Sequence, residues 1–280
     1  MNETGMLSGK VAVITGGGGV LCAEMARTIA RNGGLVAILD LSVEAAHRVK
    51  NEVEDLGGKG LALACDVLDP ASLSSARDQV MDHFGRCDIL VNGAGGNHPK
   101  GTTSREVFER DQLSDPSLRS FFDLDPSGVE FVFNLNFMGT LLPSQVFGEV
   151  MIDVEGATII NISSMNAFTP LTKIPAYSAA KAAVSNFTQW LAVHFANSGI
   201  RVNALAPGFF LTEQNRKLLT EEDGTLTERG NKIIAQTPMA RFGNPSDLSS
   251  TLLWLCDPGS GFVTGVVVPV DGGFSAYSGV

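Results

Sequence analysis

Few cysteines, few histidines and a shortage of positive charge limit what this chain can be. No two of its four cysteines form a CxxC pair, and a chain of 280 residues does not need disulfides, so we expect reduced, buried thiols at Cys22, Cys65, Cys87 and Cys256. No two of its four histidines stand at i, i+4, so the sequence gives no support for a metal site. Twenty basic against thirty acidic residues give a formal charge of -10, which argues against nucleic acid and anionic membranes as partners.

Long apolar runs are also missing. No stretch approaches the ~18 apolar residues of a membrane span, and the first ten residues lack the charged start and apolar run of a secretory signal. We therefore expect a cytoplasmic protein. With 44% hydrophobic and 18% charged residues, the chain can bury one large core, which predicts a single domain over residues 1–280.

Seven short apolar runs have the length of strands, and their continuous apolar character is typical of a parallel sheet that is covered on both faces. They are 11–14, 35–39, 61–64, 89–91, 157–162, 200–205 and 266–270. Between them apolar residues recur at helical spacing, as at Leu21, Met25 and Ile29. This alternation predicts an α/β fold: a Rossmann-type doubly wound parallel sheet of about seven strands in three layers.

Two segments, near 96–128 and 209–243, are too long for ordinary α/β connections. Each follows the carboxyl end of an expected strand, where α/β enzymes place substrate-binding groups. We therefore expect both segments to contribute to a substrate site.

A glycine-rich turn, TGGGGVLC, lies between the first strand and the first helical pattern. Glycines let the backbone approach a pyrophosphate, and the helix that follows offers unpaired N–H groups, so the predicted dinucleotide contacts are Gly16, Gly18, Gly19, Val20 and Leu21. Asp40, followed by Leu41, ends the next strand, where a carboxylate accepts hydrogen bonds from an adenosine ribose and repels a 2′-phosphate. This pattern favours NAD over NADP, although Asp40 could instead be a strand-end turn residue or a helix cap.

Tyr177 and Lys181 stand four residues apart, on one face of a helix expected over 177–197. A nearby ammonium group favours the phenolate, so we expect Lys181 to lower the pKa of Tyr177 from about 10 and make it an acid-base group. Ser164 lies thirteen residues upstream, just past an expected strand. Each residue also has a plain structural alternative: Ser164 as a cap and Tyr177 as a core tyrosine.

From end to end, these motifs resemble the short-chain dehydrogenase/reductase family, which places a catalytic Ser and a YxxxK motif at this spacing. The resemblance implies that Tyr177 exchanges the hydroxyl proton, Lys181 assists it and binds the nicotinamide ribose, and Ser164 holds the substrate oxygen. It also implies that Asn136 anchors a proton-carrying water. Further cofactor contacts implied by the family are Asp66, Val67, Asn92, Ala94, Gly95, Pro207, Gly208 and Thr212. The glycine motif departs from the family at Val20 and Cys22, where glycines are usual.

A polar set near the expected site would suit a sugar acid. It comprises Asn97, His98, Lys100, Asn166, Lys173, Asn215 and Arg216, to which Ser164 and Tyr177 add their hydroxyls. Arg216 is our first choice for binding a carboxylate, because its planar fork suits bidentate pairing, although it could equally be a surface residue.

Segments GGNHP at 95–99, SSMNAF at 163–168 and PGFFLTEQNR at 207–216 resemble those of one group within this family, the D-mannonate oxidoreductases, also called fructuronate reductases. This implies NAD-linked interconversion of D-mannonate and D-fructuronate. Two alternatives stay open: another sugar-acid or polyol dehydrogenase, such as a gluconate 5-dehydrogenase, and a noncatalytic NAD-binding regulator.

The family resemblance also implies a homotetramer assembled in part through long helices. An apolar stripe of Val184, Phe187, Leu191 and Phe195 follows one such helix. This stripe could contact a second copy of the protein, or it could pack on the protein's own sheet.

Overall fold

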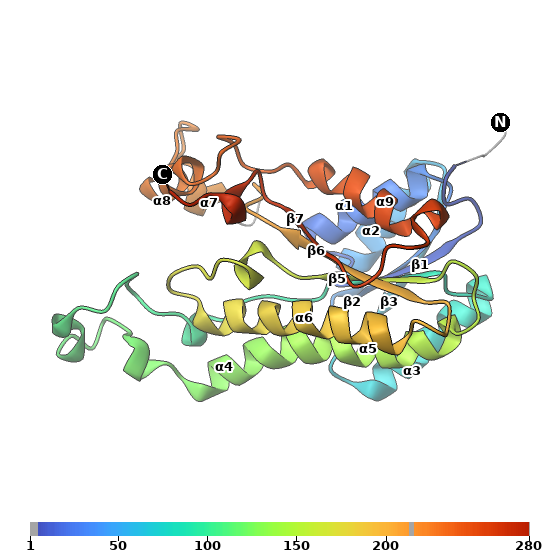
Figure 1. The fold of residues 1–280 in the computed structure, drawn as a ribbon, viewed down its shortest axis with the longest axis horizontal. Helices are drawn as coiled ribbons and strands as arrows, with labels where there is room; N and C mark the ends of the chain where they lie inside the picture. Colours follow the sequence, from blue (N-terminus) through green and yellow to red (C-terminus); the bar gives the residue numbers. More distant parts are fainter. Residues whose placement is uncertain (1–4, 213–215, 280) are drawn as a thin grey trace.

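The computed structural model describes residues 5–212 and 216–279. Its parallel strands form one sheet in the order β3-β2-β1-β4-β5-β6-β7 (Figure 1). The predicted doubly wound parallel sheet is confirmed, and each expected run overlaps one strand. The strands are β1 (Val11–Thr15), β2 (Leu35–Asp40), β3 (Lys59–Ala64), β4 (Ile89–Asn92), β5 (Thr158–Ile162), β6 (Arg201–Pro207) and β7 (Val267–Val270).

Helices cover both faces of the sheet (Figure 1). One layer contains α1 (Val20–Arg31), α2 (Val43–Asp55) and α9 (Ser249–Cys256). The opposite layer contains α3 (Pro70–Phe84), α5 (Gly139–Met151) and α6 (Pro175–His194), with α4 (Pro126–Phe133) packed along α6. Two short helices, α7 (Arg216–Leu219) and α8 (Glu228–Ala235), lie in the second long segment.

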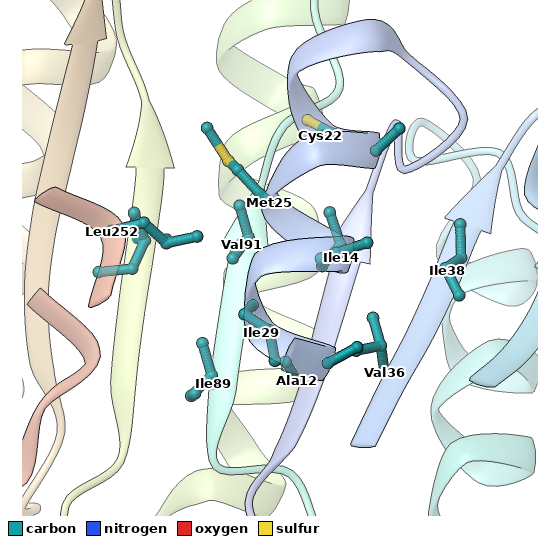
Figure 2. Close-up of a cluster of buried hydrophobic side chains, with 14 of the residues drawn as sticks. Ala12, Ile14, Cys22, Met25, Ile29, Val36, Ile38, Ile89, Val91 and Leu252 are labelled. Carbon is teal, nitrogen blue, oxygen red and sulfur yellow. The ribbon is translucent and has the colours of Figure 1, made fainter. Parts of the chain in front are cut away.

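The two layers explain the continuous apolar runs. Successive strand side chains point to opposite faces, so Ala12 and Ile14 pack under α1, whereas Val11 and Val13 belong to the core on the α3, α5 and α6 side. Figure 2 shows the first of these clusters, with Ile29 of α1 between Ile14 and Ala12 in height. Because both faces are buried, no polar alternation appears along the strand.

The helix that carries the YxxxK motif spans Pro175–His194, so the expected bounds of 177–197 were shifted toward the carboxyl end. Pro175 occupies the first turn, where its missing N–H costs no hydrogen bond. The helix ends before a turn in which Gly199 has a φ of 80°. Glycine adopts this left-handed conformation without strain, and it carries the chain into β6.

The apolar stripe on α6 packs on the protein's own sheet. Val184 and Leu191 are buried, and Phe187 and Phe195 pack against the core. Packing on the protein's own sheet therefore accounts for Val184 and Leu191, whereas Phe187 and Phe195 stay partly exposed, and a contact of the stripe with a second copy stays a prediction. The exposed large apolar side chains of α6 are Trp190 and Val193, which lie on the solvent side of the helix.

The two long segments lie beyond the carboxyl ends of the strands, at the same end of the molecule (Figure 1). The first includes the short turns η1 (Pro99–Gly101), η2 (Arg110–Leu113) and η3 (Phe121–Asp123), and the second includes α7 and α8. An ion pair of 3.5 Å between Lys232 and Glu106 joins them. None of the helices in the described part of the chain has the length and apolarity that a membrane crossing requires.

Candidate active site

The glycine-rich turn lies where the strand order reverses, between β1 and β4. In doubly wound sheets this edge forms the ligand crevice. Gly16 has a φ of 60°, and a Cβ placed on it would lie 2.8 Å from the Cα of Ala94. The turns after β1 and β4 are therefore in direct contact, and only glycine fits at position 16.

Asp40 faces the glycine-rich turn from the end of β2. Its carboxylate accepts hydrogen bonds from the N–H of Gly18 at 2.9 Å and from the N–H of Ser42 at 3.0 Å. The cap of α2 is Ser42, so Asp40 is not the helix cap that the sequence left open. A carboxylate held here fits the recognition of an adenosine ribose.

The start of α1 has the features of a phosphate-binding helix end. Gly19 precedes the helix without a side-chain cap, and its first turn carries no acidic residue. Unpaired N–H groups and the positive end of the helix dipole are therefore available to the diphosphate of a dinucleotide. Val20 and Leu21 form this first turn, as the sequence predicted.

Cys22 fits its unusual position because residue 93 is glycine. A Cβ placed on Gly93 would lie 2.2 Å from the Sγ of Cys22, so the thiol fills the space beside the turn after β4. Burial raises the pKa of this thiol to about 12, which keeps it neutral. The departure from the family's glycine pattern is thus accommodated by the opposite turn.

The remaining predicted cofactor residues lie at the same edge of the sheet. Leu41 and Asp66 are exposed after β2 and β3, and Val67 is buried against Gly139. The amide of Asn92 donates to Asn161 at 2.8 Å and braces β4 against β5. Three more predicted contacts end β6 or follow it: Pro207, Gly208 and Thr212.

Ser164 and Tyr177 come together from two different elements. Ser164 follows closely on the end of β5, and its Oγ accepts a hydrogen bond from the N–H of Asn166 at 3.3 Å. Tyr177 lies in the first turn of α6. Burial raises the pKa of Tyr177, and a hydrogen bond with Ser164 opposes this rise.

Lys181 lies on α6, one helical turn after Tyr177. Its side chain is 3% exposed, its Nζ donates to the carbonyl oxygen of Ile162 at 2.8 Å, and it lies 5.7 Å from the centroid of the Tyr177 ring. Burial lowers the pKa of Lys181 to about 8. The expectation that Lys181 lowers the pKa of Tyr177 is therefore wrong for this geometry: desolvation dominates, and Ser164 supplies the opposing contact.

Asn136 occupies a π-helical turn, η4 (Asn134–Met138), between α4 and α5. Its buried amide donates to the carbonyl oxygens of Gly96 and Val132, both at 2.7 Å. A Cβ on Gly95 would lie 2.7 Å from the Oδ1 of Asn136 and 3.1 Å from the Nζ of Lys181. The turn after β4 therefore brings Asn136 and Lys181 to one place, and such π turns are frequent at functional sites.

A cavity of about 880 Å³ lies beside the start of α6, and Ser164, Tyr177 and Lys181 are not among its lining residues. Its wall includes Ile174, whose carbonyl oxygen accepts the N–H of Ser178 in the first turn of α6. Residues of both long segments line it, and their contribution to a substrate site stays a prediction. The polar and charged lining residues are Asn97, Thr102, Glu106, Thr172, Lys173, Thr227, Glu228, Arg229, Lys232 and Gln236.

Two of the predicted substrate contacts, Asn97 and Lys173, line this cavity. Asn166 is 5% exposed, and its Oδ1 has no hydrogen-bond partner among the described residues. His98 does not line the cavity, because its Nδ1 accepts the N–H of Lys100 and its ring packs on Phe131.

Arg216 is exposed at the start of α7 and does not line the cavity either. Asn215 lies outside the described residues. Lys100 forms an ion pair with Asp125 at 3.0 Å.

Arg229 and Gln236 line the cavity although the sequence did not single them out. Both lie in the segment 209–243, which was expected to contribute substrate groups. Thr227 is a residue type that favours the cap of a helix, and it caps α8. Nothing in the residue types, however, separates Arg229 from the other cations of that segment. Only the packed position of α8 reveals which of them faces the cavity.

Comparison with known proteins places the protein among dehydrogenases. Residues 20–275 match the family model described as Enoyl-(Acyl carrier protein) reductase. The chain is 56% identical over 275 residues to the uncharacterized oxidoreductase UxuB of Bacillus subtilis (strain 168), covering 98% of both. It is 32% identical over 267 residues to the 7alpha-hydroxysteroid dehydrogenase of Escherichia coli (strain K12), covering 95% of this chain and 94% of that one.

A crystal structure from Haemophilus influenza, described as a candidate D-mannonate oxidoreductase with bound NAD, has the same fold. Its TM-score is 0.94 and its sequence is 56% identical, with 98% of each chain covered.

Proposed function

This chain belongs to the short-chain dehydrogenase/reductase family and is an NAD-dependent oxidoreductase of alcohol groups; from this premise we propose that it interconverts D-mannonate and D-fructuronate by hydride transfer. The observation that carries the chemistry is the meeting of Ser164, Tyr177 and Lys181 near a cavity with polar and charged groups in its wall, next to the glycine-rich crevice. The candidate mannonate oxidoreductase that is 56% identical supports the choice of substrate.

The crevice residues fit the cofactor. We propose that the glycine-rich turn and the start of α1 bind the diphosphate, that Asp40 binds the adenosine ribose, and that Asp66 and Val67 border the adenine. Leu41, Asn92 and Ala94 would complete this part of the site. Gly95, Pro207, Gly208 and Thr212 would border the nicotinamide end. When bound, NAD supplies the acceptor for the hydride that leaves the hydroxyl-bearing carbon.

The proton leaves by way of the tyrosine. In the oxidation, the hydroxyl of Ser164 holds the substrate oxygen while Tyr177 takes the hydroxyl proton as the C–H bond breaks and the carbonyl forms. In the reduction, Tyr177 returns that proton to the oxygen. Tyr177 therefore begins the oxidation as the phenolate and ends it as the phenol. Lys181, a cation below about pH 8 whose Nζ lies 5.7 Å from the centroid of the Tyr177 ring, would bind the nicotinamide ribose.

Asn136 completes the proposed proton route. Its side-chain amide is already bonded to the backbone of Gly96 and Val132, so the group that can anchor a water is its main-chain carbonyl. That oxygen accepts the hydroxyl of Thr140 at 2.8 Å and has a second lone pair. The amide bonds hold residue 136 in place, with its side-chain Oδ1 and the Nζ of Lys181 both against Gly95.

The substrate assignment rests on the chemistry of the cavity. Amides and hydroxyls from Asn97, Thr102 and Gln236 suit the hydroxyl groups of a sugar acid. Asn166, next but one to Ser164 in the sequence, has a buried side-chain oxygen without a hydrogen-bond partner among the described residues and is a further proposed contact. Substrate contacts by His98, Asn215 and Arg216 stay a prediction from the sequence. Because gluconate and neutral polyols carry similar hydroxyls, a gluconate 5-dehydrogenase is the alternative that these groups also allow.

Steady-state oxidation of alcohols tests the proposal. Purified protein is given NAD or NADP with D-mannonate, D-gluconate or D-mannitol at alkaline pH, and NADH or NADPH formation is followed by absorbance. We expect the highest kcat/KM with D-mannonate and NAD. A higher kcat/KM with gluconate or mannitol contradicts the assignment of D-mannonate as the substrate. If the protein binds NAD but oxidises none of the alcohols, the noncatalytic regulator is favoured.

We also propose that the protein is a homotetramer, as its family resemblance implies. Trp190 and Val193 give the outer face of α6 the exposed apolar area that an interface between copies would cover. Sedimentation or light scattering would give a mass four times that of one protomer. A monomer at micromolar concentration would contradict the proposal.

A further inference from the structure

We propose that Arg229 and Lys173 together bind the carboxylate of the substrate. This inference rests on the proposed function and names the group that its cavity recognises in a sugar acid. Both residues line the cavity beside α6. Lys173 comes shortly before Tyr177 in the sequence, and Arg229 lies in α8. Recognition of the carboxylate would make the enzyme prefer acids to neutral polyols.

The charges that line the cavity do not cancel. Lys232 is paired with Glu106 at 3.5 Å and with Glu228 at 3.2 Å, so both cavity carboxylates face this one ammonium group. Neither Lys173 nor Arg229 has an ion pair or side-chain hydrogen bond in the described part of the chain. Three cations against two carboxylates leave positive charge in this cavity, although the protein as a whole carries -10.

The backbone of Lys173 is held in a conformation that lysine rarely adopts. Its φ is 70°, in the left-handed region, which costs a non-glycine residue on the order of 1 kcal/mol. The N–H of Thr103, in the first long segment, donates to the carbonyl oxygen of Lys173 at 2.8 Å. Strain that is maintained by a contact from another segment is typical of residues that are positioned for binding, and Lys173 lies shortly before Tyr177 in the sequence.

The backbone of Arg229 is held by the packing of α8, and its side chain is exposed. Thr227 caps the helix by accepting the N–H of Gly230 at 3.0 Å, and a Cβ on Gly230 would lie 2.4 Å from the carbonyl oxygen of Leu219. The first turn of α8 is therefore pressed against α7, with Arg229 directed by a short, anchored helix. Its guanidinium offers the parallel N–H pair that binds a carboxylate in a bidentate manner.

The rest of the wall suits the body of a sugar acid. Phe209 and Phe274 pack edge to face at 5.3 Å and present apolar surface to C–H groups. In D-mannonate the carboxylate is at the opposite end of the molecule from the carbon that is oxidised. Its binding would therefore affect substrate affinity and leave the acid-base groups untouched.

Kinetics with an acid and its neutral counterpart test this inference. For Arg229→Gln and for Lys173→Gln, we expect kcat/KM with D-mannonate to fall about 10- to 100-fold, mainly through KM, because a hydrogen bond to a charged group contributes roughly 1.5–3 kcal/mol. With D-mannitol, kcat/KM should stay within about twofold, since mannitol has no carboxylate. Arg110→Gln, which removes an exposed arginine outside the cavity, is the matched control and should change neither value.

The possible failures are distinguishable. Equal losses with mannonate and mannitol, or no loss with either, overturn the carboxylate assignment while the wild type still oxidises mannonate. If kcat/KM with mannonate falls only in Arg216→Gln, Arg216 binds the carboxylate and the assignment to Arg229 and Lys173 is overturned. A wild type that oxidises gluconate in preference overturns the proposed substrate alone, and the same variants are then judged on gluconate against its neutral polyol. A wild type that prefers mannitol overturns both.

Discussion

Replacing Lys181 with methionine should stabilise the protein in the absence of NAD while abolishing turnover. Its pKa of about 8, against 10.5 for a free lysine, means that folding must desolvate a charge at neutral pH. At about 1.4 kcal/mol per pKa unit, this cost is about 3 kcal/mol. The variant also loses the hydrogen bond from Lys181 to Ile162, which lowers its stability by about 1 kcal/mol. The expected net gain in the free energy of unfolding at pH 7 is therefore about 2 kcal/mol.

The sign of the pH dependence follows from the lowered pKa. Between about pH 8 and 10.5 the unfolded protein holds a proton on Lys181 that the folded protein has lost, so wild-type stability rises with pH across this window. Methionine cannot titrate, and the variant gains nothing there. Its advantage is therefore full at pH 7 and disappears by about pH 10.5.

Urea unfolding at pH 7 and pH 10, at equal protomer concentration and without NAD, measures both effects. Lys59→Met, which removes an exposed lysine from β3, is the control and should show neither. A Lys181→Met variant that is less stable than the wild type at pH 7, or whose advantage does not change with pH, would refute the reasoning.

Three further changes test other parts of the site. Asp40→Ser should reduce the preference for NAD over NADP about 10-fold or more, because the carboxylate no longer repels a 2′-phosphate; unchanged kcat/KM ratios for the two cofactors would contradict its assignment. Gly93→Ala should lower the free energy of unfolding by about 2 kcal/mol through its clash with Cys22, and adding Cys22→Gly should recover part of this loss in urea unfolding; equal stability of both variants would contradict the contact. Since burial raises the pKa of Tyr177 and Ser164 opposes the rise, kcat/KM for alcohol oxidation should climb with alkaline pH, and Ser164→Ala should move the climb to higher pH; an unshifted profile would dissociate the two residues.

The sheet could be predicted from the sequence because its signals are local. Ala12 and Val13 face different cores, and burial on both sides leaves an uninterrupted apolar run that is visible in the sequence. The same holds for Tyr177 and Lys181, whose helical spacing alone brings them to one face. Asp40 was placed correctly because its distance from the glycine-rich turn reflects the length of one βαβ unit.

What the sequence could not predict depends on contacts between distant segments. The pKa of Tyr177 depends on how completely α6 is covered, and the spacing of the motif contains no information on this burial. The fit of Cys22 depends on Gly93, at the end of a different strand. The facing of Arg229 toward the cavity depends on the packing of Gly230 against Leu219, which no periodicity indicates.

Deuterium transfer gives the most direct test of the central claim, that Tyr177 and its neighbours catalyse hydride transfer between a sugar acid and NAD. D-mannonate carrying deuterium on the carbon that becomes the ketone is incubated with NAD and either wild-type protein or Tyr177→Phe, and the label in the nicotinamide is measured by mass spectrometry. We expect labelled NADH from the wild type and a loss of at least about 100-fold in the variant, in keeping with the removal of a general acid-base group. Label that forms equally well with Tyr177→Phe, or none at all from the wild type with any alcohol that it oxidises, would contradict the claim.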